Sequence, residues 1–196
     1  KKSIKLLNEA YKSGNYIAVV AQMNDAEEPV RKDLFDVGTA AKVIKTLELP
    51  DGNLLAILQG GPRILLEEIT ETKPYLVANV SLLPEKEDIS AENMDAETKV
   101  LLDNIKELYG KSIKHFPNLP QEASSVIKTI KNPTILINFI ASHLEIAIDE
   151  KQSMLDIDSL KERAQCTMKL LIKEMQFLEV KEQIQNKVKF DMDKQQ

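Results

Sequence analysis

The hydrophobic period of this 196-residue chain changes once, close to Pro84. Before Pro84 the apolar residues come in short runs or alternate, as in β-strands, and after residue 97 they recur at steps of three and four, as in α-helices. Pro84 itself ends the strands, because it cannot donate to a ladder. This order is typical of an α+β fold. We therefore predict a β-rich subdomain over residues 1–84, an acidic linker over 85–97 and a helical subdomain over 98–196.

A hairpin is the strongest local signal in the first subdomain. Two apolar runs, residues 40–49 and 54–58, flank Pro50-Asp51-Gly52. Proline presets a negative φ, aspartate can bond within its own turn and glycine accepts a positive φ. Gly60 and Gly61 then predict a tight connection to the next strand, since no third glycine and no helix follows to build a phosphate loop. Other predicted elements are a short helix around residues 4–11 and strands at 16–22, 63–70 and 75–83.

The predicted helices of the second subdomain each carry an apolar stripe. The first spans residues 96–115, the second spans 121–130 with Pro120 at its start, and the third spans 133–148. The stripe residues are Val100, Ile105 and Leu108 in the first helix and Ile137, Ile140, Leu144 and Ile148 in the third.

A last helix is predicted from about residue 159, where Asp158 or Ser159 can cap it. Its length would be roughly 55 Å. We expect residues 179–196 to project, because too few other helices precede them to cover the whole length. Its stripe consists of Leu160, Ala164, Met168, Leu171, Met175 and Leu178.

Charge and composition narrow the classes of partner. The formal net charge is −5, and the predicted linker alone holds six acids and one lysine, which leaves the remainder balanced. No basic field or aromatic platform remains to favour nucleic acid. The longest apolar runs fall far short of the roughly 20 residues that span a bilayer. The single cysteine, Cys166, excludes an intrachain disulfide framework and favours a reducing, cytoplasmic setting.

No catalytic constellation is present in the sequence. The two histidines, His115 and His143, lack the partners of a metal or acid–base site, and Cys166 has no neighbouring histidine. No phosphate-binding G-x-x-x-x-G-K-[ST] motif occurs. We therefore predict a non-enzymatic chain without a metal or cofactor of its own.

Several motifs follow one another along the chain: Asp33-Leu34-Phe35, Val37-Gly38-Thr39, Leu49-Pro50-Asp51-Gly52, Gly60 and Arg63. Together they resemble the N-terminal domain of the bacterial-type Lon family of ATP-dependent serine proteases. Further along, residues 149–155 resemble the segment before the long helix of that family, and residues 180–184 with Val188-Lys189 resemble the start of its coiled-coil arm.

The resemblance implies a PUA-like β-rich subdomain followed by a helical bundle. It also implies a cytosolic hexamer that unfolds and degrades damaged and regulatory proteins. Its ATPase module, which would bind ATP and Mg²⁺, and its Ser–Lys protease module would both lie outside this chain. Family members usually begin with a further strand region before Lys1, so the sheet is expected to show an unpaired edge. The chain opens without a methionine and ends inside a helical pattern, so it is expected to be a piece of a longer protein.

A substrate-recognition and assembly role for unfolded protein substrates is the function that we expect. The candidate contact residues lie in the first helix and the following loop: Lys2, Lys5, Met23, Leu34 and Phe35. For Leu34 and Phe35, packing in the core is the competing interpretation. Two alternative functions remain open at this stage, namely a purely architectural oligomerisation module and a PUA-like module that binds RNA or a small molecule.

Overall fold

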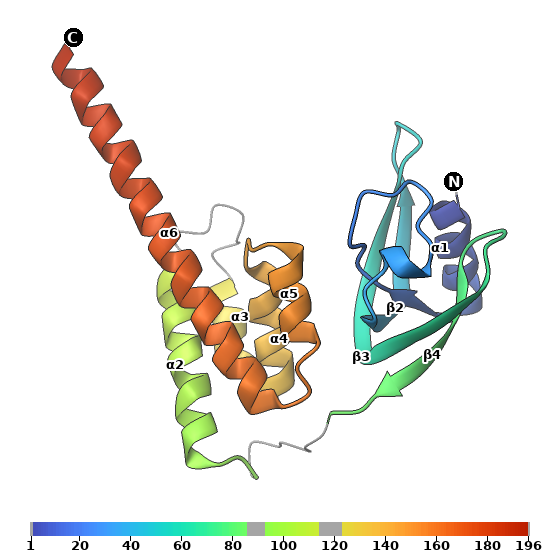
Figure 1. The fold of residues 1–196 in the computed structure, drawn as a ribbon. Coiled ribbons are helices and arrows are strands. Elements are labelled where there is room, and N and C mark those ends of the chain that lie inside the picture. Colours follow the sequence, from blue (N-terminus) through green and yellow to red (C-terminus); the bar gives the residue numbers. More distant parts are fainter. Residues whose placement is uncertain (1, 86–92, 114–122, 196) are drawn as a thin grey trace. The chain divides into compact units, whose positions relative to one another are not determined.

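The computed structural model describes residues 2–85, 93–113 and 123–195, and the chain divides into two compact units. The sheet unit is Lys1–Pro84 and the helical unit is Glu85–Gln196 (Figure 1). Strands occupy the first unit and helices dominate the second, which confirms the predicted α+β class.

The sheet unit is built on one antiparallel sheet with the strand order β1-β2-β3-β4. Helix α1 packs against β2. Gly14 follows the last residue of α1 with a φ of +70°. The elements are α1 (Lys2–Ser13), β1 (Tyr16–Val19), the 3-10 helix η1 (Arg31–Asp33), β2 (Val37–Glu48), β3 (Leu54–Glu71) and β4 (Val77–Leu83). The core contains Ala10, Leu34, Ala41, Val43, Ile64 and Leu66.

The predicted turn between β2 and β3 is confirmed in detail. Gly52 has a φ of +81°, and its N–H donates to the carbonyl of Leu49 at 3.0 Å. The Leu49 N–H donates to the Asn53 carbonyl at 2.8 Å, and the Asn53 N–H donates to Asp51 Oδ1 at 3.0 Å. The bonds from Asn53 lower the pKa of Asp51, so the turn holds this side chain as a carboxylate.

The predicted connection at Gly60 and Gly61 is wrong, because both glycines lie inside the continuous, 18-residue strand β3. The pairing shifts here: Thr39 pairs with Arg63 and Ala41 with Gly60, so Gly61 and Pro62 lie opposite Ala40 alone. Such a bulge tolerates a proline, which has no N–H for the ladder. A Cβ on Gly61 would lie 3.1 Å from the carbonyl oxygen of Ala40, so the glycine permits close backbone approach. The two glycines therefore bend a strand without ending it.

Two strand boundaries also differ from the prediction. Strand β1 ends at Val19, and Gln22 forms only an isolated bridge with Leu34. Strand β4 begins at Val77. Tyr75, expected in that strand, instead donates its hydroxyl to Glu9 Oε2 at 2.6 Å. In both cases a side-chain or loop contact has replaced ladder pairing at the end of the apolar run.

The helical unit packs its helices around a core in which Ile105, Tyr109, Ile137 and Leu171 are fully buried. Its elements are α2 (Ala96–Ser112), α3 (Ala123–Thr129), α4 (Pro133–His143), α5 (Ile148–Leu155) and α6 (Leu160–Gln195). Predicted residues Pro120 and His115 and the predicted helix start at 121 lie outside the described residues.

Side-chain caps set two of the helix starts. Asp95 accepts the N–H of Thr98 at 2.8 Å, so the last residues of the predicted linker belong to the beginning of α2. Asn132 accepts the N–H of Ile135 at 3.0 Å, and Pro133 occupies the first turn of α4.

Two predicted helix features are wrong. Val100 is 58% exposed, because the buried stripe of α2 runs through Thr98, Leu102, Ile105 and Tyr109 at steps of three and four. The helix predicted over residues 133–148 is two helices, and Ile148, expected on the stripe, begins α5 and is exposed. The break has no local glycine or proline signal. Instead, the side chain of Glu174 in α6 accepts the Glu145 N–H at 2.8 Å. A group from another helix thus satisfies a backbone donor between α4 and α5.

Helix α6 is 36 residues long and begins where predicted. The Ser159 carbonyl accepts the Arg163 N–H at 2.9 Å. Leu160, Ala164 and Leu171 are buried, and Met168, Met175 and Leu178 pack against the core, which confirms the predicted stripe. Beyond Leu178 the apolar side chains are exposed: Val180, Ile184, Val188, Phe190 and Met192.

A candidate binding corner and two exposed apolar surfaces

Lys2 and the loop that follows β1 lie together at one corner of the sheet unit. We define the binding corner as the start of α1, residues 20–30, η1 and residues 34–36. Lys2 Nζ contacts Glu28 Oε1 at 3.0 Å, which links α1 to the loop. The Met23 N–H donates to the Asp33 carbonyl at 2.7 Å and the Phe35 N–H to the Ala21 carbonyl at 3.1 Å. The structure thus brings the predicted residues Lys2, Met23, Leu34 and Phe35 into one region.

Asp33 organises the loop of the binding corner. Its Oδ1 accepts the Asn24 side-chain N–H at 2.9 Å, and its Oδ2 accepts the Val30 N–H at 3.0 Å. These bonds lower the pKa of Asp33, the Val30 backbone bond most strongly. The carboxylate therefore fixes Val30 and Asn24 relative to η1.

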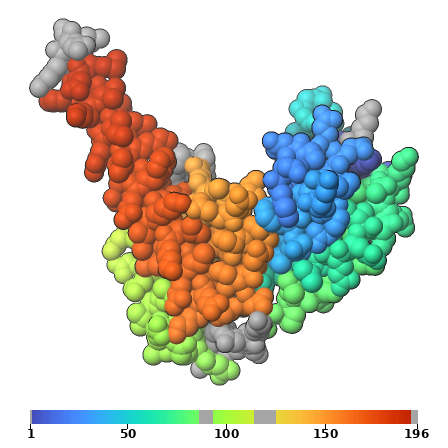
Figure 2. Space-filling view, viewed as in Figure 1, coloured from blue at the N-terminus to red at the C-terminus, as the bar shows by residue number. Residues whose placement is uncertain are grey.

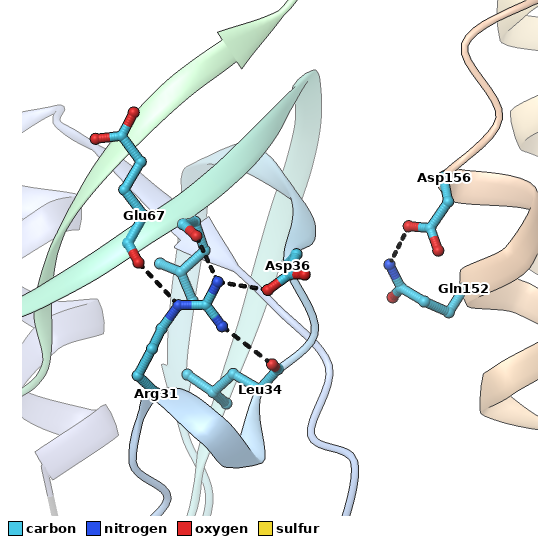
Figure 3. A network of polar contacts seen from close by, with 7 residues as sticks. Arg31, Leu34, Asp36, Glu67, Gln152 and Asp156 are labelled. Atoms are coloured by element: carbon cyan, nitrogen blue, oxygen red, sulfur yellow. Dashed lines mark hydrogen bonds and ion pairs between the residues drawn. The ribbon is translucent and has the colours of Figure 1, made fainter.

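Arg31 ties the binding corner to the sheet (Figure 3). Its Nε donates to the Glu67 carbonyl at 3.0 Å, its Nη1 to the Leu34 carbonyl at 3.3 Å and its Nη2 to the Leu66 carbonyl at 2.6 Å. Its Nη2 also pairs with Asp36. Sequence reasoning missed Arg31, because an arginine in a polar loop resembles an ordinary solvated charge, and its carbonyl partners lie up to 36 residues away.

Exposure separates the predicted contact residues into two groups. Met23 is 53% exposed and Val30, which the sequence did not single out, is 50% exposed. Leu34 is only 8% exposed and belongs to the core, whereas Phe35 is half-buried. Lys5 is exposed and lies 3.9 Å from Glu9 on α1. The binding corner therefore presents Met23 and Val30 as apolar surface on a framework that Arg31 and Asp33 hold.

A second exposed surface is the hairpin arm, which we define as residues 43–58. Strand β1 pairs with β2 only as far as Lys42, and β4 pairs with β3 only from Arg63 onward. The arm is therefore two-stranded, and it protrudes from the sheet unit (Figures 1 and 2). Leu47 pairs with Leu55 on one face, next to Ile57, and these side chains are 42–49% exposed. These apolar side chains of the predicted hairpin therefore form surface in the part of the chain that the structure describes.

The third exposed surface is the distal part of α6, residues 179–195. Val180, Ile184 and Val188 recur at steps of four and are each more than half exposed. This spacing places them along one side of the helix. The distal part is therefore an amphipathic surface that the described residues of the helical unit do not cover.

His143 and Cys166, the other residues that the sequence offered for chemistry, have structural roles in the part of the chain that the structure describes. His143 Nδ1 lies 2.7 Å from the Phe139 carbonyl, and the two rings pack at 4.5 Å. Cys166 is a half-buried free thiol, and burial raises its pKa. No described group of three or more His, Cys, Asp or Glu side chains is placed to hold a metal ion. None of the described helices has the length and apolar character needed to cross a membrane.

Comparison with known protein families gives one match over most of the chain. Residues 1–173 match the family described as the ATP-dependent protease La (LON) substrate-binding domain. A Lon protease of Flavobacterium johnsoniae is 41% identical over 196 residues, which cover 100% of this chain and 24% of that protein. A Lon protease of Porphyromonas gingivalis is 39% identical and is matched over 23% of its length. The chain thus spans about a quarter of these relatives.

Solved structures of low sequence identity share the fold. The N-terminal domain of a Mycobacterium avium complex Lon protease gives a TM-score of 0.59 at 15% identity, over 80% of this chain and 90% of that one. A Lon N-terminal domain protein from Xanthomonas campestris gives 0.57 at 14% identity, over 84% of this chain and 81% of that one. At these identities the likeness concerns the arrangement of strands and helices.

Proposed function

Because this chain belongs to the LON substrate-binding domain family, we propose that it recognises unfolded or damaged proteins for a larger, ATP-dependent serine protease. In this proposal the complete protein is a cytoplasmic hexamer, and its ATPase and Ser–Lys protease modules lie outside the chain. The chain itself contributes binding and no bond cleavage. The family match over residues 1–173 is the single observation that carries the proposal.

The binding corner supplies the contact surface in this proposal. Unfolded proteins expose aliphatic and aromatic side chains, and Met23 and Val30 offer them about half of their own surface. Methionine suits varied partners, because its unbranched side chain adapts to many shapes. Arg31 and Asp33 keep the backbone beneath these side chains fixed, so binding orders little of the corner itself.

The other predicted contact residues have different roles in this proposal. Lys2 lies within the binding corner and pairs with Glu28, and Lys5 lies next to the corner on α1 and pairs with Glu9. A substrate carboxylate would have to compete with these two glutamates. Leu34 is buried, so it packs beneath the binding corner and does not contact a substrate. Phe35 is half-buried, so only the exposed part of its ring can contact a substrate.

Binding of reduced, denatured casein to the 196-residue chain tests the proposal. The double variant Met23→Ser/Val30→Ser is expected to bind casein about tenfold more weakly, since it removes two apolar contacts. The matched control is Val100→Ser/Val126→Ser, which changes two exposed valines of the helical unit and is expected to leave binding unchanged. Equal casein affinity of both variants would remove the binding corner from the proposal, and no casein binding at high micromolar concentration would remove substrate recognition.

Assembly is a second candidate function, and the distal part of α6 favours it. A row of half-exposed aliphatic side chains on a helix is a surface that pairing with another helix would bury. Sedimentation of the unaltered chain and of Ile184→Asn/Val188→Asn tests this role. We expect self-association to weaken in the variant, and identical sedimentation of the two proteins would contradict an assembly role for this surface.

A further inference from the structure

The two outer edges of the hairpin arm differ in how they are protected. The outer edge of β2 in the arm carries the charged residues Lys45 and Glu48, and Ile44 before Lys45 is an extra residue at a shift in the pairing register. Lysines and bulges of this kind discourage further strands from pairing. The outer edge of β3 carries the uncharged run Leu54-Leu55-Ala56-Ile57-Leu58, and none of the strands that the structure describes pairs with it there. One edge is therefore blocked and the other is open.

The ladder register identifies the backbone groups at the open edge. Leu49 donates to the Asn53 carbonyl, so these two residues form a hydrogen-bonded position of the hairpin. Bonded and non-bonded pairs alternate along an antiparallel ladder. The pair of Leu55 with Leu47 is therefore hydrogen-bonded. The pairs of Leu54 with Glu48 and of Ala56 with Thr46 are not hydrogen-bonded. The N–H and C=O groups of Leu54 and Ala56 therefore point away from β2.

We propose that the outer edge of β3 in the hairpin arm, residues 54–58, binds an extended, uncharged segment of a substrate polypeptide by strand addition. This inference rests on the proposed function and names the form in which a substrate is held. Only a polypeptide in extended conformation presents alternating N–H and C=O groups that match those of Leu54 and Ala56. An edge without charge suits the apolar segments that folded proteins bury and unfolded ones expose, and it disfavours charged ones.

Side chains on both faces of the arm would contact the added strand. Leu55 and Ile57 are each 49% exposed on one face, and Leu58 is 40% exposed on the other. Their neighbours on an added strand would lie within side-chain contact distance. The binding corner offers side chains alone, whereas the arm adds backbone hydrogen bonds that do not depend on the sequence of the substrate.

Ala56→Pro is the test variant. The proline removes the outward N–H and places a ring where the added strand would lie. The hairpin itself loses no hydrogen bond, because Ala56 and Thr46 form a non-bonded pair of the ladder. Thr46→Pro is the matched control, because Thr46 pairs with Ala56 at the same non-bonded position and its N–H points outward at the blocked edge of β2. Leu55→Pro interrupts the β2–β3 ladder, so circular dichroism of the three variants separates a blocked edge from a damaged hairpin.

The probe is a labelled decapeptide of alternating valine and threonine, together with the same peptide N-methylated at every second residue. We expect the unaltered chain and Thr46→Pro to bind the plain peptide equally. Ala56→Pro and the N-methylated peptide are each expected to weaken binding about tenfold or more. Undiminished binding by Ala56→Pro or of the N-methylated peptide would overturn strand addition.

Two further outcomes separate this inference from the proposed function. If casein binds and depends on Met23 and Val30 but not on Ala56→Pro, strand addition is wrong and substrate recognition stands. If neither casein nor the decapeptide binds, both fall. If the decapeptide does not bind but Ala56→Pro abolishes self-association in sedimentation, the occupant of the edge is a second copy of the chain and the inference is overturned.

Discussion

Two buried ionisable side chains of the helical unit differ in how their charge is compensated. Arg163 is 3% exposed, donates from Nε and Nη2 to the Ile157 carbonyl and contacts Glu85 through both Nη atoms at 3.2 Å. Glu174 is 6% exposed, and only its Oε1 accepts a bond, from the Glu145 N–H. Its buried Oε2 has no hydrogen-bond partner in the described part of the chain. Arg163 is fully compensated, whereas Glu174 is not.

The pKa of Glu174 is raised, mainly because burial disfavours its ionised form. The charge of Glu145 raises this pKa further, whereas the hydrogen bond from the Glu145 N–H and the charge of Lys151 lower it. The pKa of Tyr109 is raised to about 12 by burial and by the charge of Glu174. The unfolded chain therefore releases the Glu174 proton at a lower pH than the folded chain does. Stability from this group is complete below the ordinary carboxyl pKa and declines as the pH rises toward the raised value.

Glu174→Gln is expected to stabilise the helical unit at pH 7 and to change little near pH 4. Glutamine keeps an oxygen for the Glu145 N–H and carries no charge to bury. Thermal unfolding at the two pH values measures this difference. A lower Tm for the variant at pH 7 would mean that the ionised carboxylate stabilises the fold.

Arg31→Ala is expected to destabilise the sheet unit by about 2 kcal/mol, because three carbonyls and Asp36 lose a charged donor. Urea unfolding followed by circular dichroism measures the change. Lys32→Ala, at the adjacent exposed position, is the control and is expected to be nearly neutral. Equal midpoints for the two variants would show that the Arg31 contacts are dispensable.

At the scale of elements, two glycines have opposite tolerances for a side chain. A Cβ on Gly38 in β2 would lie 2.5 Å from the Val19 carbonyl oxygen, which is backbone and cannot rotate away. A Cβ on Gly110 in α2 would meet nothing within 4 Å. Gly38→Ala is expected to cost about 2 kcal/mol or more, and Gly110→Ala to stabilise by about 0.5–1 kcal/mol. Paired urea titrations check both signs, and a neutral Gly38→Ala would mean that β1 shifts freely.

The elements that were predictable from the sequence are those that local chemistry determines. Pro50-Asp51-Gly52 specifies its turn through its own bonds, and the α6 stripe follows from helical spacing alone. The break between α4 and α5 was not predictable, because the group that satisfies it, Glu174, lies 29 residues from Glu145. The bulge at Gly61 was not predictable either, since two glycines and a proline equally suit a loop.

The candidate binding corner was also predictable only in part. Lys2 and Met23, both predicted as contact residues, lie in one region of the sheet unit, but the sequence could not show that Leu34 is buried or that Val30 is exposed. Those properties depend on the Arg31 and Asp33 bonds, which join segments that no period relates. Whether the five predicted residues contact a substrate stays a prediction.

At the scale of the whole molecule, Leu178 is the last residue of α6 that packs against the core formed by the described residues. A chain shortened after Lys181 is therefore expected to keep the Tm of the full 196-residue chain, because the removed side chains that the structure describes, those of residues 182–192, are exposed. The shortened chain is also expected to lose any self-association that depends on Ile184 and Val188. Calorimetry and sedimentation measure the two properties separately, and a clear fall in Tm would show that the distal part of α6 stabilises the fold.

The length of α6 beyond its last core contact converts rotation into displacement. Residues 179–195 extend about 26 Å at 1.5 Å per residue. A tilt of about 10° at Leu178 would move the far end by about 4.5 Å over that distance, while the packed turns at the base move by a fraction of this. A small change in the angle at which Leu171 and Leu178 pack against the core thus produces a larger displacement at the tip of α6. Spin labels at the base and tip of the helix would register very different displacements for one and the same rotation.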